Sequence, residues 1–216
     1  MGIELFVFDW SGVISDDRKP VYEAIIRILK EKGHPGMTFD EWLPQTKLTA
    51  SEFLESQGVN IDPQEASLLY KKYLDEAIVS GIKPVVYPDV QETLAYLRDE
   101  GKLLAVLSSH PSENLLNESK EYNINDYFNL ISGNSKNKVN GLLSMINKFG
   151  VPYEKVLYTG DTVFDIKAAK GAGIKSAGIS GHDDEQRGYH SRKRLAAESP
   201  DFLLYFLKDL MDEKFL

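Results

Sequence analysis

Short apolar runs that each end at a polar residue recur along the chain. They occupy residues 3–8, 103–107 and 156–159, and weaker runs lie at residues 130–131 and 176–179. Unbroken apolar runs of this length are typical of strands that are buried on both faces of a parallel sheet. Helical patterns lie between the runs, and such alternation predicts a sheet covered by helices on both faces. We therefore predict an α/β fold with a Rossmann-like, doubly wound parallel sheet.

One long segment, residues 16–84, breaks this alternation and contains helix signals without a convincing strand. An apolar stripe at helical spacing precedes Gly33, and the pair Asp62-Pro63 begins a long helical pattern that stops at Gly81. Two sequences with the capping-box pattern, TFDE and TASE, begin further helices. We predict an all-helical insert over residues 16–84, within a core formed by residues 1–15 and 85–216.

Composition narrows the choice of partners. The chain has 216 residues and a formal net charge of −8, which argues against nucleic acid and anionic membranes as partners. No apolar run approaches the roughly 20 residues of a membrane span, and the N-terminal residues lead into a strand rather than a targeting signal. The sequence has no cysteine, which suits a reducing cytoplasm. We expect a cytoplasmic monomer or homodimer that acts on a small molecule.

Polar residues at the ends of the predicted strands supply the candidate chemistry. Asp9, Ser108 and Asp161 each follow an apolar run, and ligands of open α/β sheets bind beyond the carboxyl ends of the strands. A carboxylate such as Asp9 in that position can act as a nucleophile. Asp161 and Asp165 are four residues apart where a helix begins, so both can face one spot. Magnesium prefers such carboxylates; we assign Asp161 as a direct ligand and Asp165 as a supporting acid behind it.

Serine and lysine residues near the same edge are candidates for holding an anion. Ser108 begins the turn SSHPS, and its hydroxyl and the following amides can bind a phosphate oxygen. Ser109 takes this role if the strand is shifted by one residue. Lys138 precedes the helical pattern that leads to the strand before Asp161, and Lys136 competes with it. Either lysine can neutralise a phosphate between the nucleophile and the metal.

These motifs, in this order, resemble the haloacid dehalogenase superfamily of phosphohydrolases. The matching segments are FDWSGV, VLSS, Lys138 and TGDTVFD, and the tail from Gly188 onward is similar to phosphoglycolate-phosphatase-like members. The resemblance covers residues 1–15 and about 85–216. It implies that the helical insert is a mobile cap and that the chain is a Mg²⁺-dependent hydrolase that forms an aspartyl-phosphate on Asp9.

The resemblance also implies a role for each site residue. Mg²⁺ would be held by Asp9, the main-chain carbonyl of Ser11 and Asp161, with Asp165 completing the metal site. Ser108, with Ser109 as the alternative, and Lys138 would hold the phosphoryl oxygens. Positioning and charge neutralisation supply most of the catalysis in phosphoryl transfer.

Position 11 departs from the family pattern, which has a general acid-base aspartate there. Ser11 preserves the backbone carbonyl but is a poor acid, and general acid-base catalysis is typically worth about 10²–10⁴ in rate. The substrate therefore has a good leaving group, or another residue supplies the proton, or the reaction differs. The sequence DWSG resembles the DWAG of phosphonoacetaldehyde hydrolases, which use a cap lysine, and Lys47 would be that substrate-binding residue here. The polar residues that flank Lys47 favour a surface or phosphate-steering role for it instead. A carbon–phosphorus or carbon–halogen hydrolase, or a phosphoprotein of low activity, are the alternative functions.

The segment GHDDEQRGYHSRKR, residues 181–194, is the most loop-like part of the chain. Its polar residues His182, Asp183, Asp184, His190 and Arg192 suggest a second metal site. We favour a solvated loop instead, because long polar segments rich in glycine are typical of surface loops.

Overall fold

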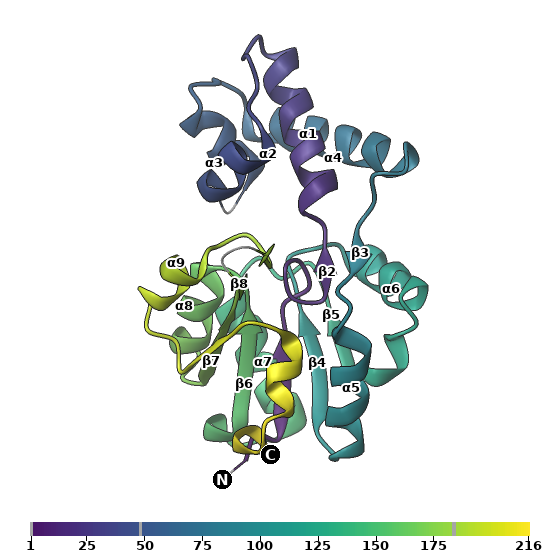
Figure 1. Cartoon of the computed structure of the whole chain (residues 1–216), viewed down its shortest axis with the longest axis vertical. Helices are drawn as coiled ribbons and strands as arrows, with labels where there is room; N and C mark the ends of the chain where they lie inside the picture. The colour runs from purple at the N-terminus through teal and green to yellow at the C-terminus, as the bar shows by residue number, and fades with distance from the viewer. Residues whose placement is uncertain (1, 48, 183–184) are drawn as a thin grey trace. The chain divides into compact units, whose positions relative to one another are not determined.

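The computed structural model describes residues 2–47, 49–182 and 185–216 and divides into two compact units (Figure 1). The first unit, called the α/β unit, comprises Met1–Asp16 and Val86–Leu216, and the second, called the helical unit, comprises Asp17–Val85. The chain passes between the units at two short strands, β2 (Ser15–Asp16) and β3 (Val85–Val86). No helix in the described part of the chain is long and apolar enough to cross a membrane.

Six parallel strands form the central sheet of the α/β unit, in the order β10-β7-β6-β1-β4-β5. Their bounds are β1 (Leu5–Phe8), β4 (Leu103–Leu107), β5 (Leu130–Ser132), β6 (Val156–Gly160), β7 (Lys175–Ile179) and β10 (Phe202–Leu204). The central strand β1 pairs with both β4 and β6 and is wholly buried, as its unbroken apolar sequence requires. The predicted doubly wound α/β class is confirmed.

Helices cover both faces of the sheet. Successive side chains of a strand point to opposite faces, so an unbroken apolar strand needs a helical layer on each side. On one face, Phe6 and Phe8 of β1 pack in a core with α5 (Val90–Asp99), α6 (Ser112–Glu121) and the C-terminal 3₁₀ helices η4 (Leu207–Met211) and η5 (Glu213–Phe215). On the other face, Leu5 and Val7 pack with α7 (Lys138–Phe149) and α8 (Val163–Gly171). The remaining elements are α9 (Arg192–Ala196), β8 (Gly181–His182), β9 (Glu185–Gln186), η2 (Asn125–Tyr127) and η3 (Tyr153–Lys155).

The helical unit contains α1 (Arg18–Glu31), α2 (Phe39–Trp42), η1 (Leu43–Gln45), α3 (Ala50–Ser56) and α4 (Pro63–Val79). The capping boxes predicted from TFDE and TASE are present at Thr38 and Thr49, and Asp62 caps α4. The long helices α1 and α4 pack against each other. The predicted helical character of the insert is therefore confirmed in its individual helices.

Candidate active site

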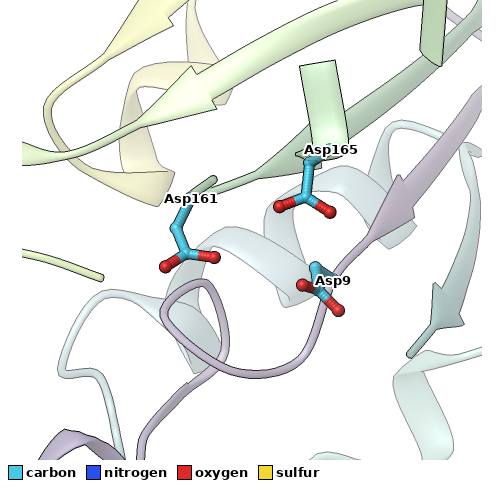
Figure 2. Close-up of side chains that lie close together, drawn as sticks. All are labelled: Asp9, Asp161 and Asp165. Carbon is cyan, nitrogen blue, oxygen red and sulfur yellow. The ribbon is translucent and has the colours of Figure 1, made fainter. Parts of the chain in front are cut away.

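Three buried carboxylates meet at the carboxyl end of the sheet. Asp9 follows β1, while Asp161 and Asp165 lie at the turn from β6 into α8. Each offers a ligand oxygen, and these oxygens lie within 4.8 Å of one another. Figure 2 shows the three side chains converging on a common space. Adjacent strands thus bring together acids that are more than 150 residues apart in sequence, as predicted from the strand ends.

Lys138, the first residue of α7, forms ion pairs with two of these acids. Its Nζ lies 2.8 Å from Asp9 Oδ2 and 2.6 Å from Asp165 Oδ1. Burial opposes the charged lysine, but the two carboxylates raise the pKa of Lys138 well above its usual value. Lys136 is exposed, so of the two candidate lysines Lys138 is the one that contacts the nucleophile candidate.

Asp165 is surrounded by hydrogen-bond donors. Its Oδ1 accepts from Lys138 Nζ and from the Tyr158 hydroxyl at 3.0 Å, and its Oδ2 accepts from the backbone N–H and hydroxyl of Thr162 at 3.0 and 2.5 Å. Although burial raises the pKa of Asp165, the charge and hydrogen bond of Lys138 bring it below the ordinary value. A carboxylate has about four lone-pair sites, and these four donors use them. This arrangement is consistent with Asp165 fixing the lysine instead of binding a metal directly.

Asp161 has a different environment. Its Oδ2 accepts a hydrogen bond from the Tyr189 backbone N–H at 2.7 Å. Burial, followed by repulsion from Asp165 and Asp9, raises the pKa of Asp161 well above 3.8. Burial and the Asp165 charge also raise the pKa of Asp9, against the opposing effect of Lys138. Lys138 contributes one positive charge beside three carboxyl groups, so the site has excess negative charge when all three are ionised.

Two glycines allow the backbone to approach Asp161 closely. A Cβ at Gly12, where φ is +72°, would lie 2.2 Å from Asp161 Oδ2. A Cβ at Gly188, where φ is +73°, would lie 2.5 Å from Asp161 Cβ. Both positions require a residue without a side chain, for conformational and for steric reasons. The donor set of carboxylate oxygens with excess negative charge fits a hard divalent cation such as Mg²⁺.

Ser108 is buried at the end of β4, whereas Ser109 is exposed. The Ser108 hydroxyl oxygen accepts a hydrogen bond from the His110 backbone N–H at 3.2 Å. Ser11, two residues after Asp9, lies with its Oγ 3.3 Å from His110 Nδ1. His110 was not among the predicted site residues, because in sequence it belongs only to a turn. His110 and Ser11 are 99 positions apart, so no helix or strand spacing in the sequence relates them.

The interpretation of residues 181–194 as a solvated loop is wrong for its central part. His182 is exposed, but Arg187 and His190 are only 4% and 2% exposed. His190 Nδ1 accepts the backbone N–H of Val163 at the start of α8, at a distance of 3.0 Å. Burial, with the charge of Arg194, lowers the pKa of His190 to about 4. Asp183 and Asp184 lie outside the described residues.

Arg187 shows why charged residues of this segment can be buried. Its Nη1 donates to both carboxylate oxygens of Asp89 at 2.8 and 2.9 Å, and its Nη2 donates to the carbonyl of Val13. The guanidinium also lies over the Tyr87 ring, 4.0 Å from its centroid. Paired charges of this kind are tolerated in protein interiors. The loop therefore packs beside the carboxylates, and Tyr189 from the same loop contacts Asp161.

Lys47, the predicted substrate-binding residue, lies in the helical unit between η1 and α3 and is exposed. A lysine requires desolvation to act as a nucleophile at neutral pH. The substrate role of Lys47 stays a prediction.

The doubly wound sheet, with an aspartate after its central strand and a lysine paired to it, defines a class of α/β hydrolases with an inserted helical unit. The family model described as "Haloacid dehalogenase-like hydrolase" matches residues 6–179. The chain belongs to this family, and its assignment as a haloacid dehalogenase-like hydrolase is confirmed.

Individual relatives agree with this assignment. A phosphoglycolate phosphatase of Pseudomonas putida is 26% identical, over 96% of this chain and 78% of that protein. A phosphoglycolate phosphatase of Vibrio vulnificus is 28% identical, over 97% of this chain and 95% of that protein. The structure of a haloacid dehalogenase-like family hydrolase from Streptococcus pneumoniae superposes with a TM-score of 0.82 at 18% identity, covering 97% of each chain. This structural likeness concerns the fold.

Proposed function

We propose that the chain is a Mg²⁺-dependent phosphatase that hydrolyses a small phosphomonoester through an aspartyl-phosphate on Asp9. One observation carries the proposal: Asp9 offers an oxygen within 4.8 Å of an oxygen of Asp161, and Asp9 Oδ2 accepts a hydrogen bond from Lys138 at 2.8 Å. A nucleophilic carboxylate beside both a second carboxylate and a fixed lysine is suited to attack on a phosphoryl group, where neutralisation of charge is the main requirement.

In the proposed reaction, an oxygen of Asp9 forms a bond to phosphorus as the bond from phosphorus to the leaving oxygen breaks. Water then attacks phosphorus, which breaks the bond to Asp9 and releases inorganic phosphate. Lys138 would neutralise a phosphoryl oxygen, and its own place is fixed by Asp165, which Tyr158 and Thr162 hold in turn. The buried Ser108 would donate a hydrogen bond to a second phosphoryl oxygen.

Asp9, Asp161 and the main-chain carbonyl of Ser11 would hold Mg²⁺, whose charge would balance the excess carboxylate and polarise the phosphoryl group. Burial, followed by repulsion from Asp165 and Asp9, raises the pKa of Asp161. This supports the assignment, because a cation in the site would offset the cost of burying the charge and relieve the repulsion.

The similarity to phosphoglycolate phosphatases suggests 2-phosphoglycolate as the first substrate to test. The helical unit would act as the cap that closes over the site and selects the leaving group. We expect the enzyme to act in the cytoplasm as a monomer or homodimer.

The experiment measures phosphate release from 2-phosphoglycolate and about a hundred other phosphorylated metabolites, with Mg²⁺ and with EDTA. Wild type should release phosphate only with Mg²⁺, and Asp9→Asn should not release it. Asp99→Asn, a change at an exposed aspartate near the end of α5, is the matched control and should behave as wild type. Phosphate release by Asp9→Asn at wild-type rates would reject the proposal.

Two other outcomes would favour the alternative functions. A stable aspartyl-phosphate without turnover would indicate a phosphoprotein. Trapping of a carbonyl substrate on Lys47 by borohydride, lost in Lys47→Arg, would indicate a phosphonate hydrolase.

A further inference from the structure

Ser11 and His110 form a contact beside the proposed nucleophile. Ser11 is two residues after Asp9, and its Oγ lies 3.3 Å from His110 Nδ1. The same ring nitrogen lies 3.5 Å from Ser108 Oγ. His110 Nδ1 thus faces two hydroxyl groups: that of Ser11, near the proposed nucleophile, and that of Ser108, which is proposed to hold the phosphoryl group. This contact joins the turns that follow β1 and β4, two neighbouring strands.

The turn that carries His110 is fixed at its backbone. The His110 N–H donates to Ser108 Oγ at 3.2 Å, and its carbonyl accepts from the Asn134 N–H at 2.7 Å. Gly133 lies so close that a Cβ there would be 2.5 Å from the same carbonyl oxygen. With both backbone groups held, the direction of the Cα–Cβ bond of His110 is fixed, and in the structure Nδ1 lies within 3.3 Å of the Ser11 hydroxyl oxygen. Preorganisation of this kind is what a catalytic group requires.

We propose that Ser11 and His110 together form a proton relay for the leaving group, with Ser11 Oγ as the contacting atom and His110 as the positioning residue that exchanges the proton. The relay rests on the proposed phosphatase function. Histidine is the side chain most often used for proton transfer at neutral pH, whereas a serine hydroxyl alone is a poor acid. The pair would therefore supply what Ser11 lacks by itself.

The proton balance covers both halves of the reaction. When Asp9 bonds to phosphorus, the electron pair of the breaking phosphorus–oxygen bond stays on the leaving oxygen. That oxygen takes the hydroxyl proton of Ser11, Ser11 Oγ takes the Nδ1 proton of the His110 imidazolium, and the imidazole is left neutral. In the second half, the attacking water gives a proton to Ser11 Oγ, and the Ser11 hydroxyl proton returns to Nδ1. Ser11 and His110 end as they began.

The test compares two aryl esters of similar shape whose leaving groups differ in their need for a proton. Phenyl phosphate releases a basic phenolate, while 4-nitrophenyl phosphate releases an anion that is stable without protonation. We expect His110→Asn to lower kcat/KM for phenyl phosphate by about 10²–10³, within the range for general acid catalysis. For 4-nitrophenyl phosphate the same variant should lose less than about tenfold. Ser11→Ala should show the same difference between the esters.

A double-mutant cycle separates the relay from a structural role of the histidine. In a Ser11→Asp background the carboxyl group contacts the leaving oxygen itself, so adding His110→Asn should cost less than about threefold with phenyl phosphate. His182→Asn, at an exposed histidine in β8, is the control and should leave both esters unaffected.

Two results would overturn the relay, and they are distinct from failure of the proposed function. Equal losses for both esters in His110→Asn, with wild type active, would show that the histidine only maintains the turn. An equal cost of His110→Asn in the Ser11 and Ser11→Asp backgrounds would show the same. If wild type releases phosphate from neither ester nor from any phosphorylated metabolite of the panel, the phosphatase proposal fails and the relay fails with it.

Discussion

Replacing Asp161 by asparagine should stabilise the metal-free protein while removing its response to Mg²⁺. Asparagine has nearly the same shape and keeps an oxygen that can accept the hydrogen bond from the Tyr189 N–H. The variant loses the negative charge of the buried Asp161 carboxylate. The pKa of that group is raised by burial and by the carboxylates of Asp165 and Asp9. The substitution thus isolates the electrostatic cost of this acid.

The magnitude follows from the separation of the carboxylates. Two unit charges 4.8 Å apart repel by about 3.5 kcal/mol at an effective dielectric constant of about 20. Asp161 has two such neighbours, and Lys138 offsets part of the repulsion. We therefore expect Asp161→Asn to raise the free energy of unfolding of the metal-free protein by about 2–4 kcal/mol at pH 7. For a chain of this size, that corresponds to an increase of the melting temperature on the order of 10 °C.

The pH dependence has a definite sign. Because the pKa of Asp161 is higher in the folded state than its ordinary value of 3.8, the folded state binds the proton more tightly. The carboxyl therefore destabilises the wild-type fold progressively as pH rises from 3.8 through the raised folded pKa. The stability difference between the variant and wild type should be small near pH 3.8 and grow toward neutral pH.

The assay is urea denaturation of both proteins, followed by circular dichroism, in EDTA and in Mg²⁺. Wild type should gain about 2.7 kcal/mol when Mg²⁺ is present at 100 times its dissociation constant, and Asp161→Asn should gain little. Lower stability of Asp161→Asn in EDTA would refute the electrostatic reasoning. An undiminished effect of Mg²⁺ on the variant would refute the assignment of Asp161 as a ligand.

Three further substitutions test other contacts of the site. Lys138→Met leaves its carboxylate partners buried without a counter-charge, so urea denaturation in EDTA should show that the free energy of unfolding falls by about 3–5 kcal/mol. Phosphate release should fall to background. Unchanged stability would contradict the ion pairs. Gly12→Ala places a Cβ 2.2 Å from Asp161 Oδ2, so calorimetry should show Mg²⁺ affinity reduced at least about tenfold. Gly33→Ala is its control, since Gly33 also has a positive φ but a Cβ there meets nothing within 4 Å; equal effects on Mg²⁺ affinity would contradict the steric explanation. Arg187→Met breaks a buried ion pair and should also cost about 3–5 kcal/mol of stability, and stability equal to wild type would show that the loop does not depend on this pair.

The positions of Asp9, Ser108 and Asp161 could be predicted because strand ends are visible in sequence. A buried parallel strand is an unbroken apolar run, and in a parallel sheet the ends of such runs share one edge. Lys138 could be placed only as one of two lysines, since the choice depends on the side of α7 that faces the carboxylates. Burial of Lys138 against Asp9 and Asp165 is a property of the packed fold.

The loop before α9 and the contact of His110 could not be predicted for a related reason. Local patterns report whether a segment is polar, but they do not report whether its charges have partners. Arg187 is buried because Asp89, 98 positions away, accepts two of its hydrogen bonds. His110 meets Ser11 across a similar separation. Strand β10 was not predicted: it occupies only the first three residues of the apolar run 202–207, which ends where the 3₁₀ helix η4 begins, and periodicity alone does not separate a strand from a helix in so short a run.

The electrostatics of the site give a physical reason for a serine–histidine pair at this position. The site already contains three buried carboxylates with one lysine, and burial, together with repulsion between the carboxylates, raises the pKa of Asp9 and Asp161. A further acid at position 11 would add to that negative charge whenever it is ionised. In our proposal, Ser11 and His110 exchange a proton with the leaving group while adding no carboxylate. The group that transfers the proton is then not a third carboxylate that needs the positive charge of the same cation as Asp9 and Asp161.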